Sequence, residues 1–336
     1  MEPQVNQETG KQSVFDRLQS VFQFREANIL FVIGILFLVL SAFVPHFLTS
    51  SNLTTTFIGL AMDGILVVGM TLVLVSGGVD LSVGSVLALT AVLAGYLAYN
   101  GVNIWLAAVI ALVAAMIIGW FSGFFISKIG LNPLIMTLGM MSVARGLAYV
   151  FTEGAPVSIV GISESFLFLG QGSVLGIPMI IIILIVVVIT GDLLLRKTAA
   201  LRQVYYVGSN EKAARLSGIN VQKVKLWVYV ISALMAGIAG LLTLARFSVA
   251  APTAGMTAEL RAIAACVIGG ASLTGGQGTI LGALLGVILV GLVNNALILM
   301  NVSVYFQSLV IGLVLIIAVT LDVYLNKRKE KQKVAA

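Results

Sequence analysis

Long apolar stretches without charge dominate the sequence. The stretches from Ile29 to Val44 and from Ile177 to Ile189 contain no Asp, Glu, Lys or Arg. A helix needs about 20 mostly apolar residues to cross the hydrocarbon core of a bilayer. On that basis the pattern predicts ten spans: 28–46, 56–76, 82–99, 105–127, 133–151, 177–195, 226–245, 259–274, 279–299 and 303–325. Because so few residues separate the spans on either side of Gly77 and of Gly275, one helix of each pair is expected to be broken or re-entrant, giving a range of eight to ten.

The composition supports an all-α, polytopic transmembrane helical bundle. Of 336 residues, 60% are hydrophobic and only 10% are charged, against about 45–50% and about 25% in a typical soluble domain. This balance excludes a disordered chain, a fibre, a disulfide-stabilised secreted scaffold and an ordinary cytosolic enzyme. The 35 glycines fit a membrane bundle, in which small residues let helix backbones approach closely.

Basic residues predict the orientation, because Lys and Arg stay on the cytoplasmic side. Sixteen of the 19 fall before residue 28, at Lys128, within 196–225 or after residue 326. They lie at the ends of apolar segments, which indicates topology signals and no nucleic-acid surface. We therefore expect a cytoplasmic tail over 1–27, a membrane domain over 28–325 with a periplasmic loop at 152–176 and a cytoplasmic segment at 196–225, and a basic cytoplasmic tail over 326–336. Both termini are then cytoplasmic.

The cytoplasmic segment is expected to contain a short helix. Asn210 is a good N-cap, Glu211 lies where the helix dipole favours an anion, and Gly218 can end the helix. Ala213 and Ala214, which lie between the cap and the glycine, favour a helical conformation.

Several motifs in one order give the chain a family resemblance. The run Gly69–Ser85 (GMTLVLVSGGVDLSVGS), the run Asn210–Asn220 (NEKAARLSGIN) and the run Gly269–Gly276 (GGASLTGG) resemble the permeases of sugar-importing ABC transporters of the ribose, arabinose and xylose type. The resemblance extends from about Phe47 to Asp322.

The resemblance implies a permease subunit in the bacterial inner membrane that works with other chains. These are a second permease copy, usually as a homodimer, a periplasmic sugar-binding protein, and a cytoplasmic ATPase that uses ATP and Mg²⁺. The sequence itself contains no G-x-x-x-x-G-K-[ST] motif, so ATP would be bound by that partner. Related permeases also carry sugar-like signals or nucleosides, and those cargoes remain open alternatives.

The resemblance also assigns a role to the short helix: it resembles the coupling helix that docks into the ATPase. The residues implied are Asn210, Glu211, Ala213, Ala214, Arg215 and Gly218. The alternative is an ordinary solvated loop. The chain departs from the family pattern at two further positions. Ser209, just before the short helix, replaces a glycine, and Arg261, in the expected span 259–274, replaces an acidic residue.

Polar residues within apolar spans are costly and are therefore candidates for the transport path. They are Asp63, Asp80, Ser82, Asn132, Thr137, Arg145, Asn294, Asn295 and Gln307. Each has a structural alternative: Asp80 and Ser82 could cap the following helix, Asp63 could pair with Arg145, and the amides could join helices. A proton-coupled secondary transporter, with Asp63 or Asp80 carrying the proton, is the other functional class considered.

Catalytic and metal sites are not expected. The chain has one Cys and one His, and no nucleophile–histidine–acid set stands out. We therefore predict a transport subunit that is not an enzyme and holds no cofactor of its own.

Overall fold

The computed structural model describes residues 25–303 and, beyond them, 305–307, 309, 310, 312, 313, 316, 317, 319, 320 and 324. Its helices are α2 (Arg25–Phe43), α3 (Ser50–Val75), α4 (Val83–Tyr99), α5 (Ile104–Phe124), a π-helical continuation (Phe125–Ile129), α6 (Pro133–Thr152), α7 (Glu164–Gln171), α8 (Met179–Lys197), α9 (Ala199–Ser209), α10 (Glu211–Leu216), α11 (Val221–Phe247), α12 (Ala258–Ile268) and α13 (Ile280–Leu299). Four two-residue strands, β1 (Val157–Ser158), β2 (Ser173–Val174), β3 (Ile177–Pro178) and β4 (Val249–Ala250), complete the described elements.

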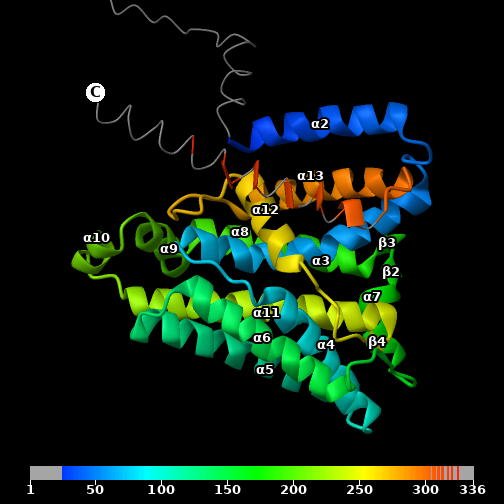
Figure 1. Ribbon diagram of the computed structural model, residues 1–336, viewed down its shortest axis with the longest axis horizontal. Helices are drawn as coiled ribbons and strands as arrows, with labels where there is room; N and C mark the ends of the chain where they lie inside the picture. Colours follow the sequence, from blue (N-terminus) through cyan, green and yellow to red (C-terminus); the bar gives the residue numbers. More distant parts are fainter. Residues whose placement is uncertain are drawn as a thin grey trace, which may run out of the picture.

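The long helices lie side by side, with α3 in the middle of the bundle (Figure 1). On one side α3 packs against α13, and α2 lies outside α13; on the other side it packs against α11, which also contacts α4 and α5. Small residues allow the close approach: a Cβ at Gly69 of α3 would lie 2.7 Å from the Cα of Ser232 on α11. The predicted tight helical bundle is therefore present.

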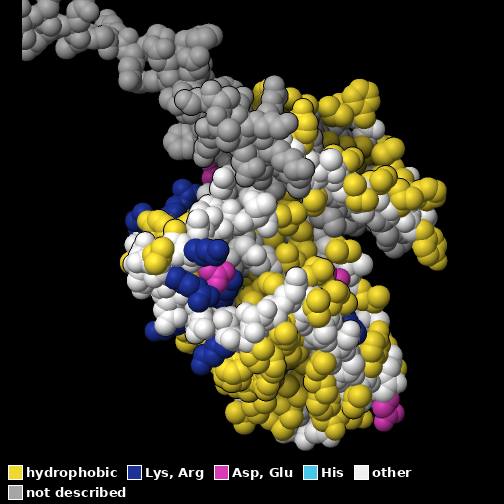
Figure 2. Space-filling model, turned by 60° about the vertical axis from the view of Figure 1, so that its left-hand side comes forward, with side chains coloured by type: hydrophobic (Ala, Val, Ile, Leu, Met, Phe, Trp, Pro, Cys, Tyr) yellow, Lys and Arg dark blue, Asp and Glu magenta, His cyan; other side chains and the backbone are white. Residues whose placement is uncertain are grey.

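The outer faces of the bundle are apolar. Leu38 of α2, Ile135 and Val150 of α6 and Ile189 of α8 are each at least half exposed. Figure 2 shows Lys and Arg side chains gathered at one end of the molecule, while hydrophobic side chains cover much of the rest of the visible face. An apolar belt with a basic end is the surface that a bilayer and its cytoplasmic boundary select.

The number of long spans differs from the expected ten. Within the part of the chain that the structure describes, seven helices are long and apolar enough to cross a membrane: α2, α3, α5 with its π-helical end, α6, α8, α11 and α13. Helix α4 has 17 residues, and α12 ends at Ile268 although the sequence predicted a span to residue 274. The chain turns after Ile268 because Gly269 and Gly270 follow, and Gly270 has a φ of +91°.

The ends of the predicted domains fall partly outside the described residues. Residues 1–24 of the expected N-terminal tail and the expected basic tail 326–336 lie there. Helix α2 begins at Arg25, three residues before the expected span. The last expected span, 303–325, is described only at isolated positions, which are helical.

The segment after α6 covers the end of the bundle opposite α10. Strand β1 pairs with β4, β2 pairs with β3, and α7 lies between β1 and β2 in sequence. The Gln171 amide of α7 donates 3.1 Å hydrogen bonds to the Ala245 and Arg246 carbonyls at the end of α11. The expected loop 152–176 is therefore a folded cap with a helix of its own.

Candidate translocation cavity and coupling helix

A cavity of about 460 Å³ with several polar residues in its lining lies between α3, α12 and α13. One face of α3 contributes Asn52, Thr55, Gly59 and Asp63, which recur every three or four residues as a single helical face requires. The other polar lining residues are Thr56, Thr257, Arg261, Asn294, Asn295 and Gln307. Since Asp63 lies near the middle of the 26-residue helix α3 and Asn52 near its start, the cavity extends from the middle of the bundle towards the end opposite α10.

An ion pair joins two walls of this cavity. The Arg261 guanidinium meets the Asp63 carboxylate in a bidentate contact, with Nε–Oδ2 at 2.9 Å and Nη2–Oδ1 at 3.1 Å. The expectation that Arg145 pairs with Asp63 is wrong. Arg145 instead donates to the carbonyls of Pro252, at 2.5 Å, and Ala254, at 2.7 Å, and so holds the loop before α12.

Amide side chains form the rest of the polar wall. Asn52 and Asn295 exchange hydrogen bonds of 3.2 and 2.8 Å between their side chains, which joins α3 to α13. Asn295 thus makes the interhelical bond that the structural alternative expected, and it also lines the cavity. Gln307 donates to the Val302 carbonyl at 2.9 Å, and Asn294 lines the cavity beside Asn295.

The remaining predicted path residues lie outside the cavity lining. Asp80 is 2% exposed and accepts hydrogen bonds from the Ser82 amide, the Ser82 hydroxyl and the Ser232 hydroxyl, at 3.0, 2.6 and 2.8 Å. These bonds hold the break before α4 and add a contact to α11, but the Ser82 side chain caps no amide of α4, so the capping alternative is wrong for Ser82. Asn132 caps α6 by accepting from the Leu134 amide, and the Thr137 hydroxyl donates to the Pro133 carbonyl.

Sequence reasoning missed part of the cavity. Arg261 was noted as a departure from the family pattern but not as a partner for Asp63, because 198 positions separate them. Asn52 and Thr55 share a helical face with Asp63, and that spacing could have identified them. Ser232 lies in an apolar helix, and no local pattern distinguishes it from ordinary helix-bonding hydroxyls.

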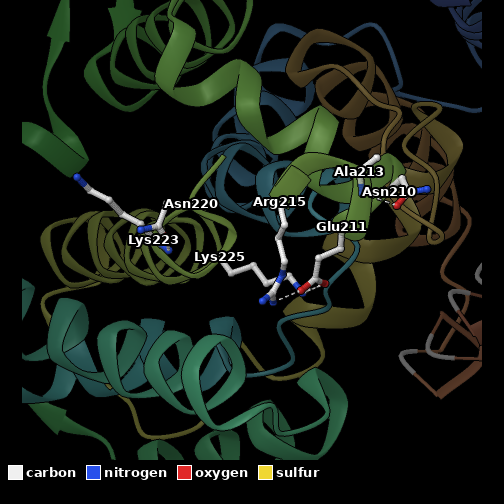
Figure 3. Close-up of polar contacts among 7 residues, drawn as sticks. All are labelled: Asn210, Glu211, Ala213, Arg215, Asn220, Lys223 and Lys225. Carbon is white, nitrogen blue, oxygen red and sulfur yellow. Dashed lines mark hydrogen bonds and ion pairs between the residues drawn. The ribbon is translucent and has the colours of Figure 1, made fainter. Parts of the chain in front are cut away.

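The predicted short helix is present as α10 at the basic end of the molecule. The Asn210 side chain accepts from the Ala213 amide at 3.0 Å, and Gly218, which follows the C-cap Ser217, has a φ of +81°. Glu211 binds Arg215 at 2.8 Å and Lys225 of α11 at 2.6 Å (Figure 3). The hydrogen bonds from Lys225 and Arg215 lower the pKa of the Glu211 carboxyl, so the carboxylate holds α10 against α11 at neutral pH.

Only part of α10 is open to a partner. Ala214 is buried against the permease itself, whereas Ala213 and Arg215 are exposed. Leu216, which the sequence did not single out, is 91% exposed at the end of the helix. An apolar side chain projecting between basic residues from a rigid turn is a suitable anchor for a protein interface.

Comparison with known proteins identifies the family. The family described as branched-chain amino acid transport system / permease component matches residues 52–319. The chain belongs to this permease family. It is 39% identical to the ribose import permease protein RbsC of Haemophilus influenzae, over 88% of this chain and 92% of that one. The RbsC of Bacillus subtilis is 41% identical over 86% and 89%.

A relative with another printed sugar matches nearly as well. The L-arabinose transport system permease protein AraH of Escherichia coli is 37% identical, over 90% of this chain and 92% of that one. No solved structure matches. The chain is thus a permease subunit of an ABC importer and a multi-pass inner-membrane protein, not an enzyme, and a secondary transporter is not favoured.

Proposed function

We propose that this permease passes a neutral monosaccharide of the pentose class into the cell. The observation that carries the proposal is the cavity of about 460 Å³ inside an otherwise apolar bundle. Its lining combines amides, threonine hydroxyls, a carboxylate and a guanidinium, which together donate to and accept from sugar hydroxyls. The pairing of Asp63 with Arg261 leaves the cavity without net charge from these two groups, which suits a neutral cargo better than an anion. The similarity to ribose and arabinose permeases supports the same class of cargo.

The path residues form two groups in this proposal. Asp63, Asn294, Asn295 and Gln307, together with Arg261, line the compartment through which the sugar passes. Asp80, Ser82, Asn132, Thr137 and Arg145 hold the surrounding helices and loops in place. Because a binding protein delivers the cargo, the cavity needs to contact the sugar only weakly.

The proposed assembly places α10 in the cytoplasm, with the ATPase and its ATP and Mg²⁺ below it. The basic residues around α9 and α10 support this side, since positive residues stay cytoplasmic. The cap formed by α7 and the strand pairs then faces the periplasm, where a sugar-binding protein docks. Both termini are cytoplasmic, and α4, α12 and the helical positions after 303 complete about ten membrane-embedded segments around a homodimeric pore.

The cargo is tested by uptake into proteoliposomes that contain the permease, its ATPase and its binding protein. We expect uptake of radiolabelled ribose or arabinose that unlabelled pentose inhibits and a nucleoside does not. Asn294→Leu should slow uptake several-fold, because it removes a cavity amide, whereas Asn100→Leu at the exposed end of α4 should not. Inhibition by the nucleoside alone, or equal uptake by both variants, would contradict the proposal.

A further inference from the structure

Four glycines from three separate segments meet at the end of the bundle that carries α10. Gly208 lies near the end of α9, Gly77 follows α3, and Gly275 and Gly276 lie in the loop between α12 and α13. We call these four residues the glycine junction. Backbone touches backbone there: a Cβ on Gly208 would overlap the Val75 carbonyl oxygen and lie 2.6 Å from the Gly276 nitrogen. A Cβ on Gly275 would lie 2.8 Å from the Gly208 oxygen and 2.9 Å from the Gly77 Cα.

Hydrogen bonds hold the three segments together at this point. The Gly276 amide donates to the Val75 carbonyl at 2.8 Å, which joins the loop after α12 to the end of α3. The Tyr205 hydroxyl of α9 donates to the Gly278 carbonyl at 2.8 Å, one residue before the cap of α13. Gly275 and Gly276 have φ values of +87° and +73°, so the loop takes a path that other residues would adopt only with strain.

The junction connects two functional parts of the molecule. Ser209 ends α9, and the next residue, Asn210, is the N-cap of α10, so a single residue connects the two helices. On the other side, α3 ends two residues before Gly77, and the loop that holds Gly275 and Gly276 joins α12 to α13; these three helices line the cavity. Asp63 lies 12 residues before Val75, about 18 Å along the axis of α3.

We propose that the glycine junction is the positioning element through which α10 acts on the cargo cavity. This inference rests on the proposed docking of α10 to the ATPase. Because no side chain separates the backbones, a displacement of α9 is passed directly to the end of α3 and to the loop that joins α12 to α13. A side chain at Gly208 would separate these segments, and loss of the Tyr205 hydroxyl would release the loop before α13 from α9.

Two variants with matched controls test the junction. Gly208→Ala adds a methyl group where the backbones meet, whereas Gly139→Ala adds one on α6 with nothing beyond its chain neighbours and the backbone of its own helix within 4 Å. Tyr205→Phe removes the hydroxyl bound to Gly278, and Tyr206→Phe makes the same change at a neighbouring side chain that is 54% exposed. In proteoliposomes with the ATPase and binding protein, we expect sugar uptake per ATP hydrolysed to fall about tenfold in Gly208→Ala and about fivefold in Tyr205→Phe. Both controls should match the unsubstituted protein.

Amide hydrogen exchange distinguishes a failure of the glycine-junction proposal from a failure of the proposed docking of α10 to the ATPase. Binding of the nucleotide-loaded ATPase should slow exchange in 211–216 and change it in 269–279; in Tyr205→Phe only the first effect should remain. Protection of 211–216 without any change in 269–279 of the unsubstituted permease would overturn the junction and leave the docking of α10 intact. Absence of protection at 211–216 would overturn both. If Gly208→Ala does not assemble with the ATPase, Tyr205→Phe alone tests the proposal. Uptake per ATP hydrolysed that is equal in Tyr205→Phe and Tyr206→Phe would overturn it.

Discussion

At the scale of single residues, the Asp63–Arg261 pair is the feature that most alters the picture drawn from the sequence. The sequence identified Asp63 as a costly charge within an apolar span and Arg261 only as a departure from the family pattern, and it could not join them, since residues 198 positions apart meet only through the packing of α3 against α12. Asp80 was more accessible to prediction, because its hydrogen bonds with Ser82 join residues only two positions apart. Its third bond, from Ser232, depends on the same kind of packing.

The pair makes a prediction about stability. Asp63→Asn or Arg261→Gln leaves a partly buried charge without its partner, and each should lower the free energy of unfolding by about 1–3 kcal/mol. The double variant should be more stable than the sum of the two losses implies, because it leaves neither charge unpaired. Thermal unfolding in detergent measures all four proteins. Additive losses would show that the two side chains do not interact in the folded permease.

At the scale of elements, local signals predicted most helices but not where helices break. Asn210 and Gly218 correctly predicted the two ends of α10, because an N-cap side chain and a glycine with positive φ each affect only the few residues next to them. By contrast, α12 stops at Ile268, and α7 forms inside a segment expected to be a loop. Hydropathy alone does not distinguish a glycine-containing re-entrant loop from the end of a span, and α7 is ordered by its contacts with α11.

Helix α10 makes a prediction about the ATPase. Leu216→Ser should weaken binding of the ATPase about tenfold or more, because it removes the exposed apolar anchor without disturbing the permease. Leu175→Ser is the matched control, since Leu175 is 97% exposed on the cap at the opposite end. Co-purification of the ATPase with each variant gives the answer, and equal binding by the two would remove Leu216 from the interface.

The same interface has a second, electrostatic requirement. Glu211→Lys replaces the partner of Arg215 and Lys225 with a third cation, so α10 should leave its place on α11 and the ATPase should no longer associate. Membrane insertion should be unaffected. An unchanged ATPase association with this variant would count against α10 as the coupling helix.

At the scale of the whole molecule, composition and hydropathy were sufficient to predict a polytopic helical bundle with a basic end. They could not give the number of full crossings. The apolar stretches that contain α4 and α12 were long enough to be predicted as spans, but the helices themselves have only 17 and 11 residues. Nor could they show that α3, α12 and α13 line one cavity, or that α9 meets the end of α3 and the loop between α12 and α13, since that arrangement depends on long-range packing of glycine-rich segments.

The most direct test that this chain is an ABC importer permease is to measure sugar uptake driven by the partner ATPase. Vesicles with the permease, its ATPase and its binding protein should accumulate the sugar only when ATP is present on the side that carries α10. An uncoupler should not reduce this uptake, and omission of the ATPase should abolish it. Uptake that persists without the ATPase and collapses when an uncoupler is added would contradict the account and indicate a secondary transporter.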